Sequence, residues 1–166
     1  MVGLIKDQYH KSNNYIALYV SVLEFNKIEY KFVDINSANF FHDIKDVNYL
    51  IYRWGHYDHD RQIAQTILPI IEGTLDINCF PNQKTCWHFD DKIKQYYLLK
   101  SLGYPYVETT IFWDKKAAIE WSKKTEYPLV YKLKGGAGSK NVRKINTSKK
   151  AISIVNKMFR NGVHTN

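Results

Sequence analysis

Three glycines that follow an alternating strand constrain the fold of this 166-residue chain more than any other feature. Residues 127–143 read YPLVYKLKGGAGSKNVR, and the alternation places Val130, Lys132 and Lys134 on one face of a short strand. Glycines let the backbone turn its N–H groups toward an anion, and the nearby lysines supply positive charge. We therefore expect a strand that leads into a phosphate-binding loop. The alternative is a glycine-bearing hairpin with solvated lysines.

Helices and a further strand are predicted around this segment. Asp90 and Asp91 suit the positive N-terminal end of a helix, and Gly103 suits its C-terminal cap. Asp114 is predicted to be the N-cap of the next helix. The expected elements are a helix over residues 93–103, a strand over 104–112 after a proline turn, and helices over 115–124 and 148–160.

The order of these elements, with the segments TCWHFDDK ending at Lys92 and KLKGGAGSKNV starting at Lys132, resembles the ATP-grasp superfamily. The resemblance is closest to the ATP-grasp proteins of bacterial surface-polysaccharide gene clusters, which are similar to glutathione synthetase and the ribosomal-protein glutamate ligases. These relatives usually carry glycine where this chain has Asn141, a residue that tolerates the left-handed conformation. The loop is neither a Walker A sequence nor a dinucleotide fingerprint.

The resemblance implies an ATP-dependent carboxylate–amine ligase, in which ATP phosphorylates a carboxylate and an amine displaces phosphate from the acyl-phosphate. It assigns electrostatic roles to the lysines and to the backbone N–H groups of the loop, and no catalytic nucleophile or base is identified. The implied ATP-binding residues are Lys92, Lys132, Gly135, Gly136, Ala137, Gly138, Ser139, Lys140 and Asn141.

The acidic residues are unevenly distributed. Residues 115–166 carry 13 Lys and Arg but only 2 Asp and Glu, and none follows Glu126. Mg²⁺ on phosphates is held by carboxylate oxygens, which in ATP-grasp enzymes belong to the subdomain after the lid. We therefore expect this chain to be the N-terminal half of a ligase, with Mg²⁺ bound only in a completed enzyme. The alternative is a non-catalytic nucleotide-binding or scaffold module, either a truncated product or a partner subunit, and a homo-oligomer is also considered.

The N-terminal part alternates short apolar strands with helices, which predicts an α/β fold with a parallel, doubly wound sheet. By resemblance this is a pre-ATP-grasp domain over residues 1–80, followed over 81–166 by the small α+β lid subdomain. The expected strands are 2–5, 30–35 and 49–52, and the expected helices are 15–25, with Ala17, Leu18, Ser21, Val22 and Phe25 on its inner side, and 61–72, which ends at Gly73.

The loops beyond the strands' carboxyl ends are candidates for substrate binding. His56, Asp58, His59 and Asp60 crowd together, but a loop gives no rigid frame for a metal, so we predict no metal site and a helix capped by Asp58 or Asp60. By resemblance this edge holds the carboxylate or the amine. The candidate substrate residues are Lys11, Arg53 and His56.

Composition narrows the remaining function classes. The 45% hydrophobic and 15% aromatic content is that of a folded protein, and the two cysteines lack a metal-ligand set, so we read them as reduced. No signal peptide or membrane span is recognisable, which predicts a cytoplasmic protein that does not bind membranes. The net charge of +8 would attract polyanions, but no nucleic-acid-binding pattern is present, so nucleic acid is not the expected partner.

Overall fold

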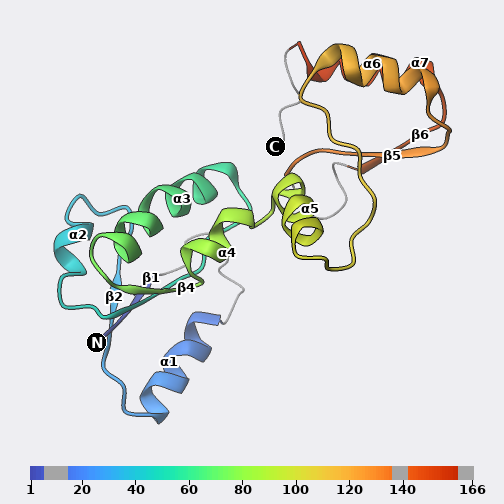
Figure 1. Ribbon diagram of the computed structural model, residues 1–166. Helices are drawn as coiled ribbons and strands as arrows, with labels where there is room; N and C mark the ends of the chain where they lie inside the picture. The colour runs from blue at the N-terminus through green and yellow to red at the C-terminus, as the bar shows by residue number, and fades with distance from the viewer. Residues whose placement is uncertain (6–14, 136–141, 161–166) are drawn as a thin grey trace. The chain divides into compact units, whose positions relative to one another are not determined.

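The computed structural model describes residues 1–5, 15–135 and 142–160 (Figure 1). The chain divides into two compact units, Met1–Phe89 and Asp90–Asn166. The sequence placed the domain boundary near residue 80. In the structure α4 (Gln83–His88) lies beyond that point and packs against α3 (Asp58–Gly73) in the first unit. None of the helices in the described ranges is both long enough and apolar enough to span a membrane.

The first unit contains a four-stranded sheet in which every pair of neighbours is parallel, in the order β2-β1-β3-β4. The central strand β1 pairs on both sides, so that Val2 lies opposite Tyr30 on one neighbour and Tyr49 on the other. The strands are β1 (Val2–Ile5), β2 (Tyr30–Val33), β3 (Tyr49–Tyr52) and β4 (Asn78–Phe80), and the remaining helices are α1 (Tyr15–Phe25) and α2 (Phe40–Asp43). This confirms the predicted parallel sheet.

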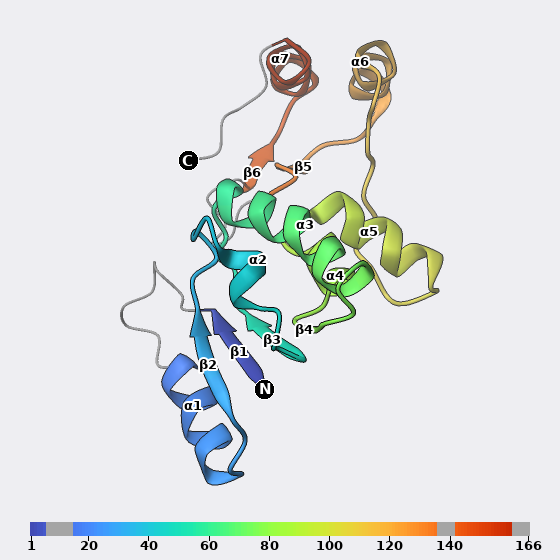
Figure 2. The same cartoon turned by 90° about the vertical axis from the view of Figure 1, so that its left-hand side faces the viewer.

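Helices cover both faces of this sheet, as the doubly wound prediction requires (Figures 1 and 2). One face carries a large apolar cluster in which Leu50 of β3 packs with Leu68 and Ile71 of α3, and all three are fully buried. The other face carries a smaller cluster in which Leu4 of β1 packs with Leu23 of α1. The core of the unit is therefore split into two layers by the strands.

The predicted inner side of α1 is wrong. Leu18 and Val22 are each 57% exposed and Phe25 is 87% exposed. Leu23 is the buried residue of the helix, with Tyr19 and Val20 packed beside it. Because α1 is apolar on nearly every side, its sequence pattern did not decide which side the sheet covers.

The helix α3 begins earlier than predicted. It starts at Asp58, and its N-cap is Tyr57, which makes no side-chain capping bond. Asp58 and Asp60 therefore lie in the first turn rather than at the cap. A carboxylate in the first turn is still favourable there, because the N-terminal end of a helix carries partial positive charge.

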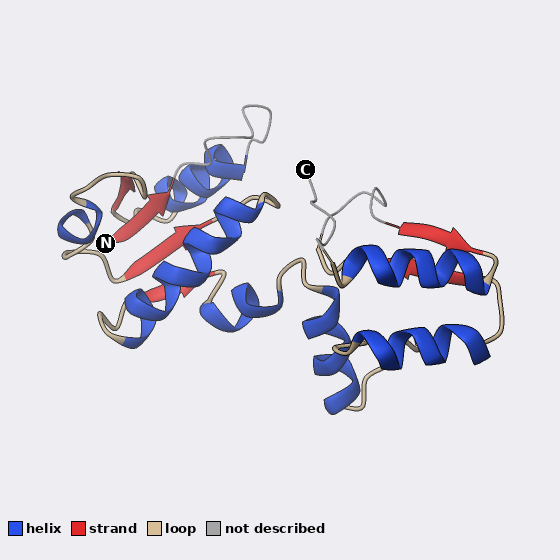
Figure 3. Cartoon of the chain, turned by 90° about the horizontal axis from the view of Figure 1, so that it is seen from above, coloured by secondary structure: helices blue, strands red, loops and turns tan. Residues whose placement is uncertain are grey.

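In the described part of the second unit a two-stranded antiparallel hairpin of β5 and β6 is accompanied by three helices. The helices α6 and α7 lie side by side over one face of the hairpin (Figures 1 and 3). Asp114 caps α6 with its side chain, as the sequence predicts, and Asp91, one of two acidic residues expected near the N-terminal end of α5, is the N-cap of that helix. The elements are α5 (Lys92–Ser101), α6 (Lys115–Lys124), β5 (Leu129–Lys132), β6 (Val142–Ile145) and α7 (Ser148–Met158).

The strand predicted over residues 104–112 is not formed. Within the described residues this segment pairs with no strand, and residues 104–110 are all exposed. Side-chain contacts hold it to α5 instead, because the Tyr96 hydroxyl donates to Glu108 Oε1 at 3.2 Å and the Tyr96 ring meets Tyr106 edge to face. A sequence of β-forming residues becomes a strand only where a neighbouring strand is available.

Candidate functional site

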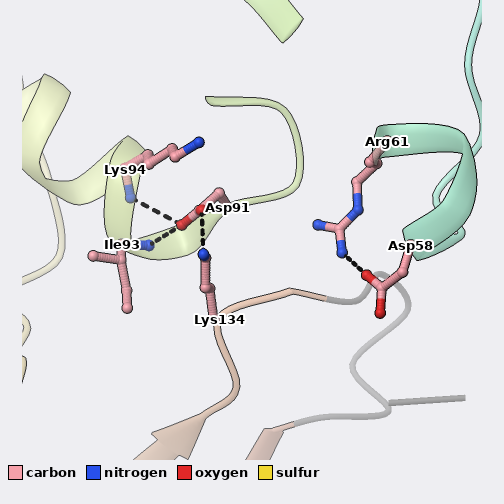
Figure 4. A network of polar contacts seen from close by, with 6 residues as sticks. All are labelled: Asp58, Arg61, Asp91, Ile93, Lys94 and Lys134. Carbon is pink, nitrogen blue, oxygen red and sulfur yellow. Dashed lines mark hydrogen bonds and ion pairs between the residues drawn. The ribbon is translucent and has the colours of Figure 1, made fainter. Parts of the chain in front are cut away.

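The end of β5 is tied to the start of α5 by a backbone bond and an ion pair. The backbone N–H of Lys92 donates to the carbonyl oxygen of Lys134 at 2.9 Å. The Lys134 ammonium lies 3.2 Å from Asp91 Oδ2 (Figure 4). These contacts bring Lys92 beside the point where the chain leaves β5 and enters the glycine segment.

Asp91 is the centre of this junction. It is only 3% exposed, and its Oδ1 accepts bonds from the backbone N–H groups of Ile93 and Lys94, each at 3.1 Å (Figure 4). Its carbonyl oxygen accepts from Gln95 N–H at 2.9 Å. The first four N–H groups of α5 therefore all have protein partners, so an anion at this junction would have to be bound by lysine side chains and other backbone groups.

The outer face of the hairpin, which we call the lysine face, is formed by residues that alternate along both strands. Directly opposed residues share a face, and the register pairs Lys132 with Val142 and Val130 with Lys144. Lys132 and Lys144 are exposed, and Val130 is 60% exposed. The lysine face consists of Val130, Lys132, Val142 and Lys144.

The inner face of β5 is anchored by apolar contacts. Leu133 is buried, and the Tyr131 hydroxyl donates to Met158 Sδ of α7 at 3.0 Å. Burial raises the pKa of the Tyr131 hydroxyl above its usual value. Because the inner residues are packed against helices, Lys132 is directed to the opposite side, which confirms the predicted alternation along β5.

Most of the predicted glycine loop lies outside the described residues. Gly135 is described and half-buried, whereas Gly136, Ala137, Gly138, Ser139, Lys140 and Asn141 lie in the range 136–141, which the structure does not describe. Lys11 falls in the other internal range outside the description, 6–14. The two predicted lysines that can be placed, Lys92 and Lys132, both belong to the elements that flank this loop.

The other two predicted substrate residues follow β3 in the first unit. The Arg53 guanidinium lies 3.8 Å from the centre of the Tyr15 ring of α1, a cation–π contact. The His56 ring stacks on Phe89 with centroids 5.1 Å apart. Each side chain is therefore held by an aromatic ring rather than left in an unconstrained loop.

Sequence reasoning missed several buried polar atoms near these residues that have no hydrogen-bond partner in the described part of the chain. Among them are Nε1 of Trp54 and Oδ2 of Asp60, a carboxylate that is 6% exposed. The other oxygen of Asp60 lies 3.1 Å from His59 Nε2. A side chain at Gly55 would place its Cβ 2.3 Å from Asp60 Oδ2, so the Asp60 carboxylate would have to move to admit it. Orphaned buried polar groups are uncommon and often mark functional regions.

The acidic and histidine side chains of this segment do not form a metal site in the described chain. Asp58 pairs with Arg61 (Figure 4), and Asp60 is paired with His59. Among the described residues, no group of three or more His, Cys, Asp or Glu side chains is arranged to hold a metal ion.

Comparison with known proteins gives a likeness in fold. No protein-family model matches this sequence, and no curated protein matches it. Among solved structures, the chain is similar to the crystal structure of the RimK domain protein ATP-grasp from Sphaerobacter thermophilus DSM 20745, with a TM-score of 0.62 and 14% sequence identity. The match covers 98% of this chain but 60% of that protein. Nearly the whole chain therefore has an α/β fold similar to that of an ATP-grasp protein.

Proposed function

We propose that the second unit binds the phosphate groups of ATP, and that the chain is part of an ATP-dependent carboxylate–amine ligase working through an acyl-phosphate. The similarity in fold to an ATP-grasp protein supports ATP as the ligand. The proposal covers phosphate binding by these residues, and the joining of a carboxylate to an amine is proposed for the whole enzyme.

The observation that carries the proposal is the junction between α5 and β5. The bond from Lys92 N–H to the Lys134 carbonyl holds the first residue of α5 at the entrance to the glycine segment. Lys132 lies two residues earlier, on the outer face of the same strand. Lysines from two elements thus flank one segment whose glycines can present backbone N–H groups, which is the composition that phosphate binding requires.

The three lysines of this junction have different environments. Lys134 is paired with the carboxylate of Asp91, so part of its charge is already balanced within the protein. Lys132 is exposed and belongs to a strand whose inner face is packed. We therefore assign the main phosphate contact to Lys132, with Lys92 as the second contact and Gly135 to Asn141 as backbone donors.

The residues at this junction do not fit Mg²⁺. The acidic side chain at the centre of the junction, Asp91, is buried and already bonded to two N–H groups and a lysine. Mg²⁺ prefers carboxylate oxygens that remain open to water and phosphate. What these residues can do is neutralise and orient phosphate oxygens, and no step of the proposal passes through a metal.

For the other substrate we propose Arg53, His56 and Lys11, of which Lys11 lies outside the described residues. Arg53 is held against Tyr15 and would offer a charged fork to a carboxylate. His56 is held by stacking on Phe89, and an imidazole side chain can donate or accept a hydrogen bond.

The test compares two lysines on the same face of the hairpin. Lys132→Ala should weaken ATP binding about tenfold to a hundredfold, because a charge-assisted contact contributes about 1.5–3 kcal/mol. Lys144→Ala removes the same charge from the lysine face but lies opposite Val130, farther from the glycine segment. It should weaken binding less than about threefold. Isothermal titration at matched ionic strength measures both.

Two results would separate the alternatives. Equal losses from Lys132→Ala and Lys144→Ala would mean diffuse attraction to a basic surface rather than a phosphate site. If Lys132→Ala and Lys92→Ala both bind ATP like the unaltered chain, the phosphate proposal fails and the scaffold alternative replaces it. His56→Ala serves as the control in the first unit and should leave ATP affinity unchanged.

A further inference from the structure

The helix α1 presents a second apolar side to solvent, opposite the one that packs on the sheet. Four large side chains on this side are exposed: Tyr15 by 45%, Leu18 and Val22 by 57% each, and Phe25 by 87%. We call these four residues the α1 stripe. Monomeric proteins rarely expose contiguous apolar surface of this kind unless it is an interaction site.

The polar side chains around the stripe are satisfied within the helix and its neighbour. Ser21 Oγ donates to the carbonyl oxygen of Leu18 at 2.9 Å. The Glu24 carboxylate accepts from the Tyr30 hydroxyl of β2 at 2.9 Å. At one end of the stripe the Arg53 guanidinium lies over the Tyr15 ring, so its uncharged part consists of Leu18, Val22 and Phe25, and a partner that binds there has to be apolar where they meet.

The spacing of the stripe is the feature that selects the partner. Its residues follow one another at intervals of three, four and three. This is the spacing of the apolar residues along the contact between two helices that pack side by side. This series reads the same in both directions. When a second α1 runs antiparallel across a two-fold axis, Leu18 meets Val22 of the second copy and Tyr15 meets Phe25 of the second copy, so both stripes are covered at once.

Charge complementarity favours the same antiparallel arrangement. The first turn of α1 contains no acidic residue and its last turn contains no basic residue, so neither end of the helix dipole is balanced by its own side chains. Antiparallel pairing places the positive end of each helix beside the negative end of the other. The first unit carries 8 Lys and Arg against 10 Asp and Glu, so its net charge of −2 opposes association only weakly.

We propose that the α1 stripe is a homodimer interface, in which two copies of this chain pack their α1 helices antiparallel with Leu18 against Val22. Ile28 and Phe32, each 45% exposed, extend the apolar surface beyond the helix and form its rim. The interface involves none of the residues assigned to phosphate binding. A test of the dimer is therefore independent of the phosphate-binding proposal.

Sedimentation velocity of the full chain over about 1–100 µM tests this directly, since that range resolves micromolar self-association. The unaltered chain should dimerise. Leu18→Glu and Val22→Lys should each weaken the dimer at least about a hundredfold, because each places two charges in an apolar interface. The double variant with both changes places the introduced glutamate of each copy opposite the introduced lysine of the other, and dimerisation should recover.

Two controls separate the stripe from general effects of charge. Ala17→Lys adds a lysine to an exposed position of α1 that is not in the stripe, and Val107→Lys adds one to a 74%-exposed residue of the second unit. Both should dimerise like the unaltered chain. Any one of three results would overturn the proposal. The unaltered chain could remain monomeric at about 100 µM, or the dimer could persist in both Leu18→Glu and Val22→Lys. The third result is a double variant that stays dissociated while its circular dichroism spectrum is native.

Discussion

The two units of this protein differ in how they are packed and in how they are charged. Sixteen of the 21 buried apolar side chains among the described residues belong to Met1–Phe89, and five to Asp90–Asn166. The second unit carries 16 Lys and Arg against 6 Asp and Glu, a net charge of +10, compared with −2 for the first. Apolar burial is the main favourable term in folding, whereas concentrated charge of one sign opposes it. Stability is thus concentrated in one unit and attraction for anions in the other.

The largest effect expected from the denser packing of the first unit is a slow reaction of the Cys79 thiol, which lies in β4. Burial, with a smaller contribution from the charge of Glu72, raises the pKa of its thiol to about 12. The thiolate is the reactive form, so at pH 8 the folded protein should react with a disulfide reagent about a thousandfold more slowly than the urea-unfolded protein.

Absorbance kinetics in a Cys86→Ala background measure this rate for Cys79 alone. In the folded protein the rate should keep rising with pH toward about 12, whereas in the unfolded chain it should level off above about 9. Similar rates in both states would mean that the first unit opens readily, and the contrast in packing would break down.

A smaller difference is expected when one leucine is truncated in each unit. Leu68→Ala removes a fully buried side chain from the large cluster and should cost about 3–5 kcal/mol of unfolding free energy. Leu133→Ala in the second unit, where burial is sparser, should cost about 2 kcal/mol. Hydrogen exchange read separately for each unit reports both values. Equal costs would show that the second unit is packed as tightly as the first.

The smallest predicted difference lies within the second unit and compares two helix caps. Asp91→Ala removes a buried cap that also pairs with Lys134, and it should cost about 1–2 kcal/mol. Asp114→Ala removes an exposed cap that accepts from Ala117 N–H at 2.7 Å, and it should cost about 0.5–1 kcal/mol. Urea titration of both variants gives the comparison. A larger cost for Asp114→Ala would contradict the central place of Asp91 in the junction.

Elements with strong local signals were predicted from the sequence with nearly correct bounds. The helix α6 follows its cap at Asp114 and covers the predicted residues. The helix α5 ends at Ser101, two residues short of the predicted range, and Gly103 adopts the positive φ of +69° that suits a residue just beyond a helix. The strand β3 also has the predicted bounds. Each of these signals acts within a few residues.

Elements that depend on distant partners were missed or wrong. The strand β4 and the helix α4 were not predicted, and they are held together by Glu72 of α3, whose carboxylate accepts the backbone N–H groups of Cys79 at 3.3 Å and Gln83 at 2.7 Å. The segment 104–112 has the composition of a strand but pairs with none in the described chain. No local pattern reports whether such a partner is present.

The candidate site divides in the same way. The sequence by itself determined that Lys132 points away from the packed side of β5 and that Asp114 caps α6, because alternation and capping follow from the backbone geometry of neighbouring residues. Only the tertiary structure decided that Asp91 also pairs with Lys134, that Asp60 keeps an orphaned oxygen, and that the α1 stripe faces solvent. These outcomes depend on which distant elements fill the space around a side chain, and that is settled when the packed faces compete for burial.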